Sequence, residues 1–122
     1  MKSKQSLYNS FVFGFKGITL VLKERNFLID LVFAGITIIA SFILKISYLE
    51  WISILICIAL VLSLETLNTA IEKTIDLLHP QQHSKAGEVK DIAAGAVLIA
   101  AIISAVIGGI IFIPKFYDLI KN

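Results

Sequence analysis

Charge is scarce in this sequence: Asp, Glu, Lys and Arg make up 16% of its 122 residues, against roughly 25% in ordinary globular chains. Hydrophobic residues make up 57%. A soluble domain of this size leaves a large share of its surface in water, so it cannot hide this much apolar surface. The composition therefore argues against a soluble fold and predicts one membrane domain over residues 1–122.

Three further absences narrow the function. The single cysteine, Cys57, rules out a disulfide within the chain. A net charge of +2, without a basic cluster or an aromatic platform, gives no basis for nucleic acid as a partner. The sequence also lacks a Walker-type glycine loop, a dinucleotide-binding glycine motif and the spacing of zinc ligands. Any phosphoryl chemistry must therefore use a different scaffold.

Two apolar stretches have the length of membrane-spanning helices. Residues 92–113 carry no charge, and at 1.5 Å per residue they cross a hydrocarbon core of about 30 Å. We expect Asp91 to bound this span on one side and Pro114 on the other. Residues 27–44 form another span, which only Asp30 interrupts.

A third helix is predicted between these two. Its uncharged part, residues 51–64, is too short to cross a membrane alone, so the span must include Glu65 and the residues after it. The helix is expected to cover 51–78 and to end before Pro80, which cannot continue it. The predicted fold is therefore all-α and integral to the membrane, with three transmembrane helices.

Residues 1–25 are predicted to form an amphipathic helix ahead of the first span. Phe11, Phe15, Ile18 and Leu22 recur at helical spacing on one face. Such a helix suits the cytoplasmic surface of the bilayer. Packing of this helix against the spans is the alternative.

Lys and Arg are divided unevenly between the two sides of the predicted membrane. Eight fall on the side of the N-terminus and the second loop, and three fall on the other side. Because cytoplasmic loops carry an excess of these residues, we expect a multi-pass protein of the inner or plasma membrane with a cytoplasmic N-terminus.

A polar stripe occupies the second half of the 51–78 helix. At about 100° per residue, Glu65, Asn68, Glu72 and Asp76 fall on one side of the helix. Glu65 lies at membrane depth, where a charged residue costs about 2.5 to 3.5 kcal/mol and is by default a candidate for function. The structural alternatives are a hydrogen bond to a neighbouring helix, or a side chain that reaches the headgroups.

Two functions fit this stripe. In the first, carboxylates at the membrane surface hold Mg²⁺, which prefers oxygen ligands and keeps room for substrate phosphates. Glu65 is then a candidate general base, and Glu72 lies two turns farther along the helix, about 10 Å away. In the second, the protein is a non-enzymatic transport subunit that uses Glu65 as its intramembrane proton or cation site.

The segment ETLNTAIEKTID, followed after a short loop by KDIAAGAVLIAA, resembles the prokaryotic diacylglycerol kinase family of small membrane lipid kinases. The family pattern is E-x-x-N-[ST]-A-I-E-x-x-x-D, then a His and K-D-x-[AG]-[AS]-A-V-L. The match is close over residues 65–101. The stretches AAGAVL and GGIIFIPK are more similar to the branch with many undecaprenol kinases than to the enterobacterial diacylglycerol enzymes.

The resemblance implies an ATP-dependent lipid kinase that phosphorylates diacylglycerol or undecaprenol. Family members are homotrimers whose sites form between subunits. Glu65 matches the family's catalytic base, which takes the proton from the lipid hydroxyl. Glu72 and Glu24 match the carboxylates that bind the Mg²⁺ of Mg-ATP.

The resemblance also implies binding positions. The positions expected to bind the lipid substrate are Asn68, Phe27 and Ala94. The positions expected around the nucleotide are Asp76, Gln81, Gln82, His83, Lys90 and Asp91.

The sequence departs from the family pattern near its first span. Leu28 stands where the family usually has Arg, and Asp30 stands where a polar or acidic residue or a His is common. The stretch ending at Glu24 is one residue shorter than usual. Phe13 replaces a Tyr on the nucleotide side, and Gln82 replaces an aromatic residue.

Overall fold

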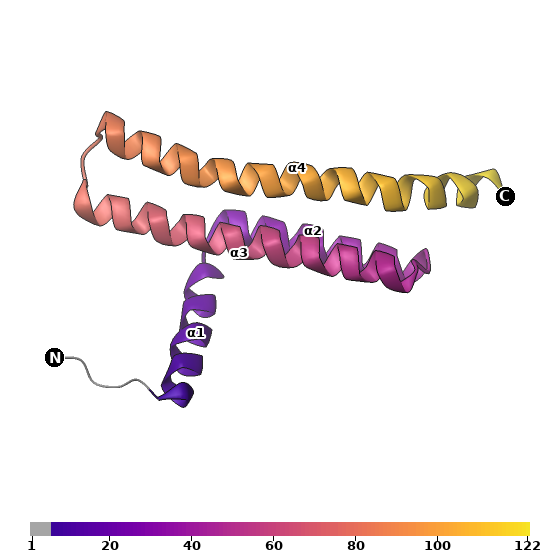
Figure 1. Ribbon diagram of the computed structural model, residues 1–122, viewed down its shortest axis with the longest axis horizontal. Helices are drawn as coiled ribbons and strands as arrows, with labels where there is room; N and C mark the ends of the chain where they lie inside the picture. The colour runs from indigo at the N-terminus through magenta and orange to yellow at the C-terminus, as the bar shows by residue number, and fades with distance from the viewer. Residues whose placement is uncertain (1–5) are drawn as a thin grey trace.

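The computed structural model describes residues 6–122, which form four helices and no strand. These are α1 (Leu7–Val21), α2 (Arg25–Ile43), α3 (Tyr48–Leu78) and α4 (Ser84–Lys121). Figure 1 shows α3 and α4 lying side by side and antiparallel, with α2 beside α3 and α1 crosswise to the other three. The prediction of one shorter N-terminal helix and three long helices is confirmed.

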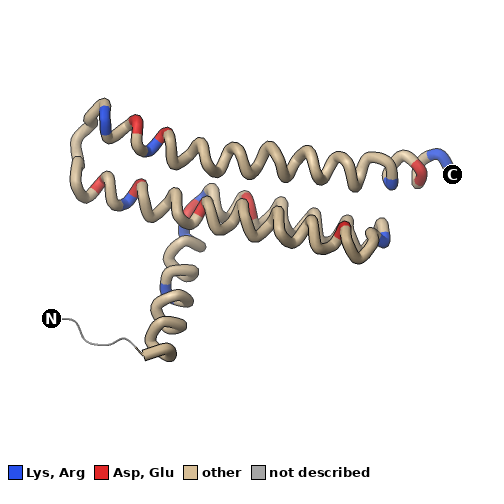
Figure 2. Tube along the Cα trace, in the orientation of Figure 1, with Lys and Arg blue, Asp and Glu red and all other residues tan. Residues whose placement is uncertain are grey.

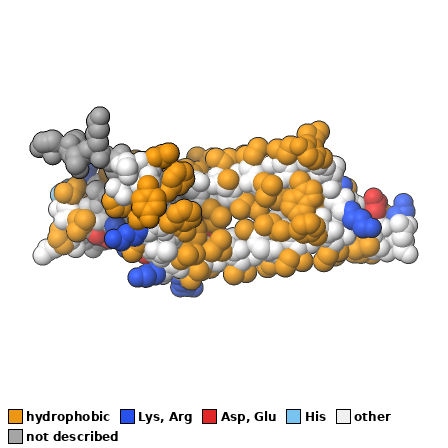
Figure 3. Space-filling view, turned by 90° about the horizontal axis from the view of Figure 1, so that it is seen from below, with side chains coloured by type: hydrophobic (Ala, Val, Ile, Leu, Met, Phe, Trp, Pro, Cys, Tyr) orange, Lys and Arg blue, Asp and Glu red, His pale blue; other side chains and the backbone are white. Residues whose placement is uncertain are grey.

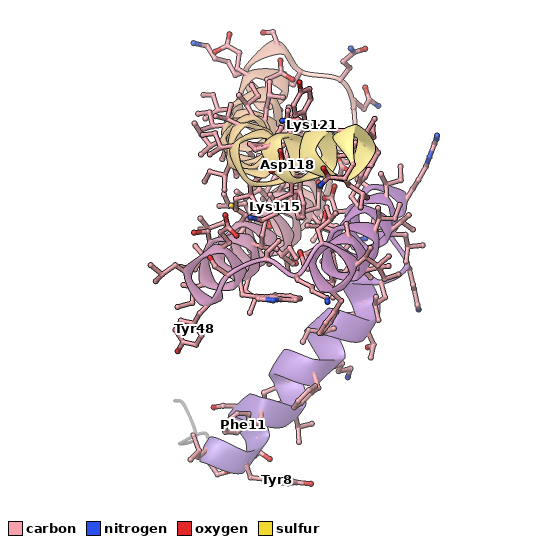
Figure 4. The ribbon with its side chains drawn as sticks, turned by 90° about the vertical axis from the view of Figure 1, so that its right-hand side faces the viewer. Tyr8, Phe11, Tyr48, Lys115, Asp118 and Lys121 are labelled. Carbon is pink, nitrogen blue, oxygen red and sulfur yellow. The ribbon has the colours of Figure 1, made fainter. Side chains whose placement is uncertain are left out.

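The helix α1 stands apart from the rest of the chain. The Ser6 side chain caps its start by accepting a hydrogen bond from the Asn9 backbone N–H at 3.1 Å. The helix ends at Val21, short of the predicted residue 25, and residues 1–5 of the predicted helix lie outside the described part. Tyr8 and Phe11 are exposed, and Figure 4 shows both directed away from the long helices. This geometry suits a helix lying along a membrane surface.

Each of α2, α3 and α4 is long and apolar enough to cross a membrane. Figure 2 shows charged residues near the ends of the long helices and part-way along α1 and the α2–α3 pair, whereas the middle of α4 carries none. Hydrophobic side chains cover the central part of the face seen in Figure 3. Large apolar side chains such as Ile110, 69% exposed, would be unfavourable in water. The exposed apolar surface is therefore what a bilayer or neighbouring subunits would cover.

A tight connection joins α2 to α3. Lys45 adopts a left-handed backbone conformation with φ 52°, which ends α2. Ser47 and Glu50 then form a capping box, in which the Ser47 side chain accepts from the Glu50 N–H and the Glu50 carboxylate accepts from the Ser47 N–H. The cap explains why α3 begins at Tyr48 rather than at the predicted residue 51. The other end of α3 is Leu78, as predicted from Pro80.

The helix α4 runs straight past the boundary expected at Pro114. Proline removes one backbone donor, but membrane helices tolerate it when the freed carbonyl is satisfied locally. The helix continues to Lys121, and Lys115 forms an ion pair with Glu50 at 3.1 Å. Figure 4 shows Lys115, Asp118 and Lys121 at this end of α4, together with Tyr48 of α3. The uncharged stretch 92–113, predicted as the membrane span, lies within this longer helix.

Packing is concentrated on α3, which contacts α4 most extensively and α2 next. A small core of Ile46, Ile54 and Ile111 joins the α2–α3 connection to α3 and α4. Because α3 lies between two partners, polar side chains on its second half can be held by α2 on one side and α4 on the other. That half of α3 carries the predicted stripe.

Candidate functional site

Glu65 is the only buried charged residue in the described part of the chain. It is 6% exposed, and its neighbours Asn68 and Thr69 on α3 are also buried. The carboxyl of Asp30, from α2, lies against Glu65. Two acidic groups from different helices therefore meet at a depth where the surrounding side chains are mostly apolar.

The polar stripe becomes more exposed along α3. Glu65 and Asn68 are buried, Glu72 is half-buried and Asp76 is exposed. The Asn68 side-chain amide donates a hydrogen bond to Glu72 Oε2 at 3.5 Å. This contact leaves the other carboxylate oxygen of Glu72 available to a ligand. The stripe thus leads from an apolar environment towards water.

Two ion pairs join the ends of the helices beside this stripe. Lys73 of α3 lies 3.4 Å from Glu24 Oε2, which ties the start of α2 to the turn of α3 that carries Glu72. Lys90 of α4 lies 2.8 Å from Asp76 Oδ1. All four side chains retain solvent exposure. Each of them can therefore exchange its partner for a dissolved ion of opposite charge at a small cost in free energy.

A pocket of about 300 Å³ lies where the loop joins α3 and α4. Its wall includes five of the six residues predicted to surround the nucleotide, which are Asp76, Gln81, Gln82, His83 and Lys90. His83 begins α4, since its Nδ1 accepts hydrogen bonds from the Lys85 and Ala86 N–H groups. The sixth residue, Asp91, is exposed and does not line the pocket.

The expected lipid-binding residues are not all brought together. Asn68 lies beside Glu72, as described above, and Phe27 is buried in the first turn of α2. Ala94 is exposed on α4 and does not line the pocket at the loop between α3 and α4. The geometry therefore supports a common site for Asn68 and Glu65, while Ala94 stays a prediction.

Sequence reasoning assigned no role to two residues that the structure brings to this site. Asp30 contacts Glu65; in the sequence it interrupts an apolar run and stands where the family commonly has a polar or acidic residue or a His. Lys73 pairs with Glu24; in the sequence it is only one of the eight Lys and Arg residues on the predicted cytoplasmic side. Both contacts join different helices, so spacing along one helix could not reveal them.

The carboxylates of the site were compared with the ligands that a metal ion needs. No group of three or more His, Cys, Asp or Glu residues able to hold a metal occurs among residues 6–122. Glu72 and Glu24, the two predicted metal ligands, carry carboxylate oxygens and belong to no such group. That donor set fits a Mg²⁺ ion whose remaining ligands are phosphate oxygens and water.

The fold and the site define a small multi-pass membrane protein with a buried glutamate in a polar stripe on its central helix. The sequence profile of the prokaryotic diacylglycerol kinase family matches residues 12–112, so the chain belongs to this family of lipid kinases. Family membership favours the kinase hypothesis over the transport subunit.

Three named relatives cover most of the chain. It is 43% identical to the undecaprenol kinase of Bacillus subtilis over 109 residues, which are 88% of this chain and 89% of the relative. It is 34% identical to a diacylglycerol kinase of Synechocystis over 119 residues, 93% of this chain and 66% of the relative. It is 33% identical to a diacylglycerol kinase of Haemophilus influenzae over 108 residues, which are 87% of this chain and 92% of the relative.

Proposed function

We propose that this protein transfers the γ-phosphate of ATP to the hydroxyl of a membrane lipid, with Glu65 as the general base. The observation that carries the proposal is the burial of Glu65 at one end of a stripe that becomes exposed at Glu72 and Asp76. A lipid alcohol stays in the bilayer and ATP stays in water. An enzyme that joins these two substrates needs a site that is buried at one end and exposed to water at the other.

In the proposed reaction, the Glu65 carboxylate accepts the hydroxyl proton as the lipid oxygen attacks the γ-phosphorus. A phosphorus–oxygen bond to the lipid forms, the bond to the β-phosphate oxygen breaks, and ADP leaves. Phosphoryl transfer asks the protein mainly for positioning and charge neutralisation. Lys90, freed from Asp76, meets phosphate oxygens, and Asn68 holds Glu72 in place through its amide.

Glu72 and Glu24 would hold the magnesium ion of Mg-ATP. When bound, the ion neutralises the phosphate charge and fixes the geometry of the phosphates. Glu24 is already paired with Lys73. To bind the ion, its carboxylate would have to contact Lys73 and the ion together or release Lys73. The pocket at the loop, with Gln81, Gln82 and His83, would receive the rest of the nucleotide.

Undecaprenol is the acceptor that we propose, with diacylglycerol as the alternative. The relative named undecaprenol kinase is 43% identical to this chain, against 34% and 33% for the two relatives named diacylglycerol kinase. We also propose a homotrimer, with the N-terminus and the active site in the cytoplasm. The large apolar side chains exposed on single helices support further helix–helix contacts.

The test is phosphate transfer by the purified protein. Radioactive phosphate from γ-labelled ATP should enter undecaprenol in detergent micelles, and thin-layer separation should show the phosphorylated lipid. Parallel reactions with diacylglycerol measure the preference between acceptors. Transfer to neither lipid in the presence of Mg²⁺ contradicts the proposed function, and a preference for diacylglycerol contradicts the proposed acceptor.

A further inference from the structure

Two imidazole rings lie against each other in the pocket at the loop between α3 and α4. The ring centroids of His79 and His83 are 4.9 Å apart and the ring planes are inclined by 36°, which is a stacked arrangement of aromatic side chains. Both residues line the pocket, and both are exposed. Each ring has two faces and its partner covers only one of them. The pair therefore offers aromatic surface to a ligand in the pocket.

The two rings are held in different ways. His83 is fixed at the start of α4, because its Nδ1 accepts hydrogen bonds from the Lys85 and Ala86 N–H groups. His79 follows the end of α3 and caps it with its backbone, whose N–H donates to the Ile75 carbonyl at 2.7 Å. The cap of α4 thus uses the ring of His83, whereas the end of α3 does not need the ring of His79. The His79 ring rests on a fixed partner and is free for another task.

The histidines lie at the end of the pocket that is farther from the polar stripe. Along α3, the order Glu72, Asp76, His79 leads away from the stripe. Along α4, Lys90 lies seven residues from His83, which is about 10 Å, and pairs with Asp76. A nucleotide whose phosphates meet Lys90 therefore has its base at the histidine end.

The chemistry of this end fits an uncharged planar ring. Among the described residues, Lys90 is the only Lys or Arg in the wall of the pocket, so a phosphate at the histidine end would meet no such cation. Gln81 and Gln82 line the same pocket, and their amides can both donate and accept hydrogen bonds. A nucleotide base has flat faces for stacking and a polar edge for such amides.

We infer that the ring of His79 is the surface on which the base of ATP stacks, with His83 supporting that ring from its other side. The inference rests on the proposed kinase function and names a base-binding residue to which that function gave no role. Stacking on an aromatic side chain is open to every base, because every base has a π-face. The contact therefore contributes affinity for the nucleotide and leaves the phosphates to Lys90.

Steady-state kinetics of three substitutions separate stacking from hydrogen bonding. His79→Ala should raise the KM for ATP about 5- to 10-fold, the lower end of the effect of removing an aromatic partner of a base. The kcat and the KM for lipid should not change. His79→Phe keeps a flat ring and should restore most of the affinity, whereas His79→Gln keeps polar groups without a ring and should behave as His79→Ala.

A control substitution and a ligand without a base exclude general damage. Leu77, 84% exposed near the end of α3, does not line the pocket, so Leu77→Ala should keep the parental KM for ATP. Inorganic tripolyphosphate, used as a competitive inhibitor, carries phosphates but no base. Its inhibition constant should be the same for the parent and for His79→Ala, whereas Lys90→Met should raise it.

A binding measurement tests the same contact without phosphate transfer. His79→Trp places a fluorescent ring at the proposed stacking position, and ATP added without lipid should quench its emission. Tripolyphosphate should not quench it. Trp51 is the only natural tryptophan and lies near the other end of α3. The parent protein therefore gives the background, which ATP should leave unchanged.

Four results would overturn the inference. The first is an unchanged KM for ATP in His79→Ala. The second is affinity restored by His79→Gln and not by His79→Phe, which would show a hydrogen bond in place of stacking. The third is an equal loss of affinity for ATP and for tripolyphosphate, and the fourth is equal quenching of His79→Trp by both. A parent that phosphorylates no lipid overturns the proposed function, whereas quenching of His79→Trp by ATP alone would still support the base site.

Discussion

Replacing Glu72 by Gln should weaken the magnesium dependence of the reaction while leaving the local structure intact. The Asn68 amide donates to Glu72 Oε2 at 3.5 Å, and a Gln side chain offers an acceptor oxygen at the same place. The substitution therefore removes the negative charge and keeps the hydrogen bond. The more drastic Glu72→Ala would lose both and could not separate them.

The size of the effect follows from the exposure of the carboxylate. Two unit charges 4 Å apart interact by about 1 kcal/mol in water, so a divalent ion gives about 2 kcal/mol. Glu72 is half-buried rather than fully solvated, and this figure is accordingly a lower bound. Since about 1.4 kcal/mol corresponds to tenfold, the free Mg²⁺ concentration that gives half the maximal rate should rise roughly 30-fold or more.

The assay is a titration with free Mg²⁺ at fixed lipid and ATP, for the parent and for Glu72→Gln. Asp118→Asn is the matched control, because it also neutralises one carboxylate but lies at the far end of α4 (Figure 4). Its titration should coincide with that of the parent. A Glu72→Gln curve within about threefold of the parent refutes the assignment of Glu72 as a metal ligand.

Three smaller predictions concern the residues around this carboxylate. Glu24→Gln should shift the same Mg²⁺ titration less than Glu72→Gln, because Lys73 already neutralises part of its charge; an equal or larger shift contradicts this ranking. Lys90→Met should raise the KM for ATP about tenfold, because a phosphate contact is lost, and should not change the lipid KM. An unchanged KM for ATP would show that Lys90 does not contact the nucleotide and only pairs with Asp76. Ser47→Ala removes the side-chain cap of α3 and should lower stability by about 1 kcal/mol with unchanged kinetics; thermal unfolding in detergent measures this, and an altered KM would show that the two ends of the helices are coupled.

The sequence predicted features that depend on one helix at a time. Helical periodicity indicated the stripe of Glu65, Asn68 and Glu72, and the structure shows Asn68 and Glu72 in contact on α3. Pro80 correctly indicated the end of α3 at Leu78. These predictions succeed because the geometry of an α-helix fixes the position of each side chain relative to its neighbours three and four residues away.

Features that depend on two helices were not predictable in the same way. The contact of Asp30 with Glu65 and the ion pair of Lys73 with Glu24 depend on how α2 packs against α3. Small changes in helix rotation would separate these side chains without changing any pattern in the sequence.

The central claim is that Glu65 takes the proton of the lipid hydroxyl, and Glu65→Gln tests it most directly. The amide has nearly the same shape but cannot act as a base, so kcat should fall by about 10²-fold or more. The KM values for ATP and for lipid should change little, and the Asp118→Asn control should keep the parental kcat. A purified Glu65→Gln protein that phosphorylates undecaprenol or diacylglycerol as fast as the parent would contradict the account.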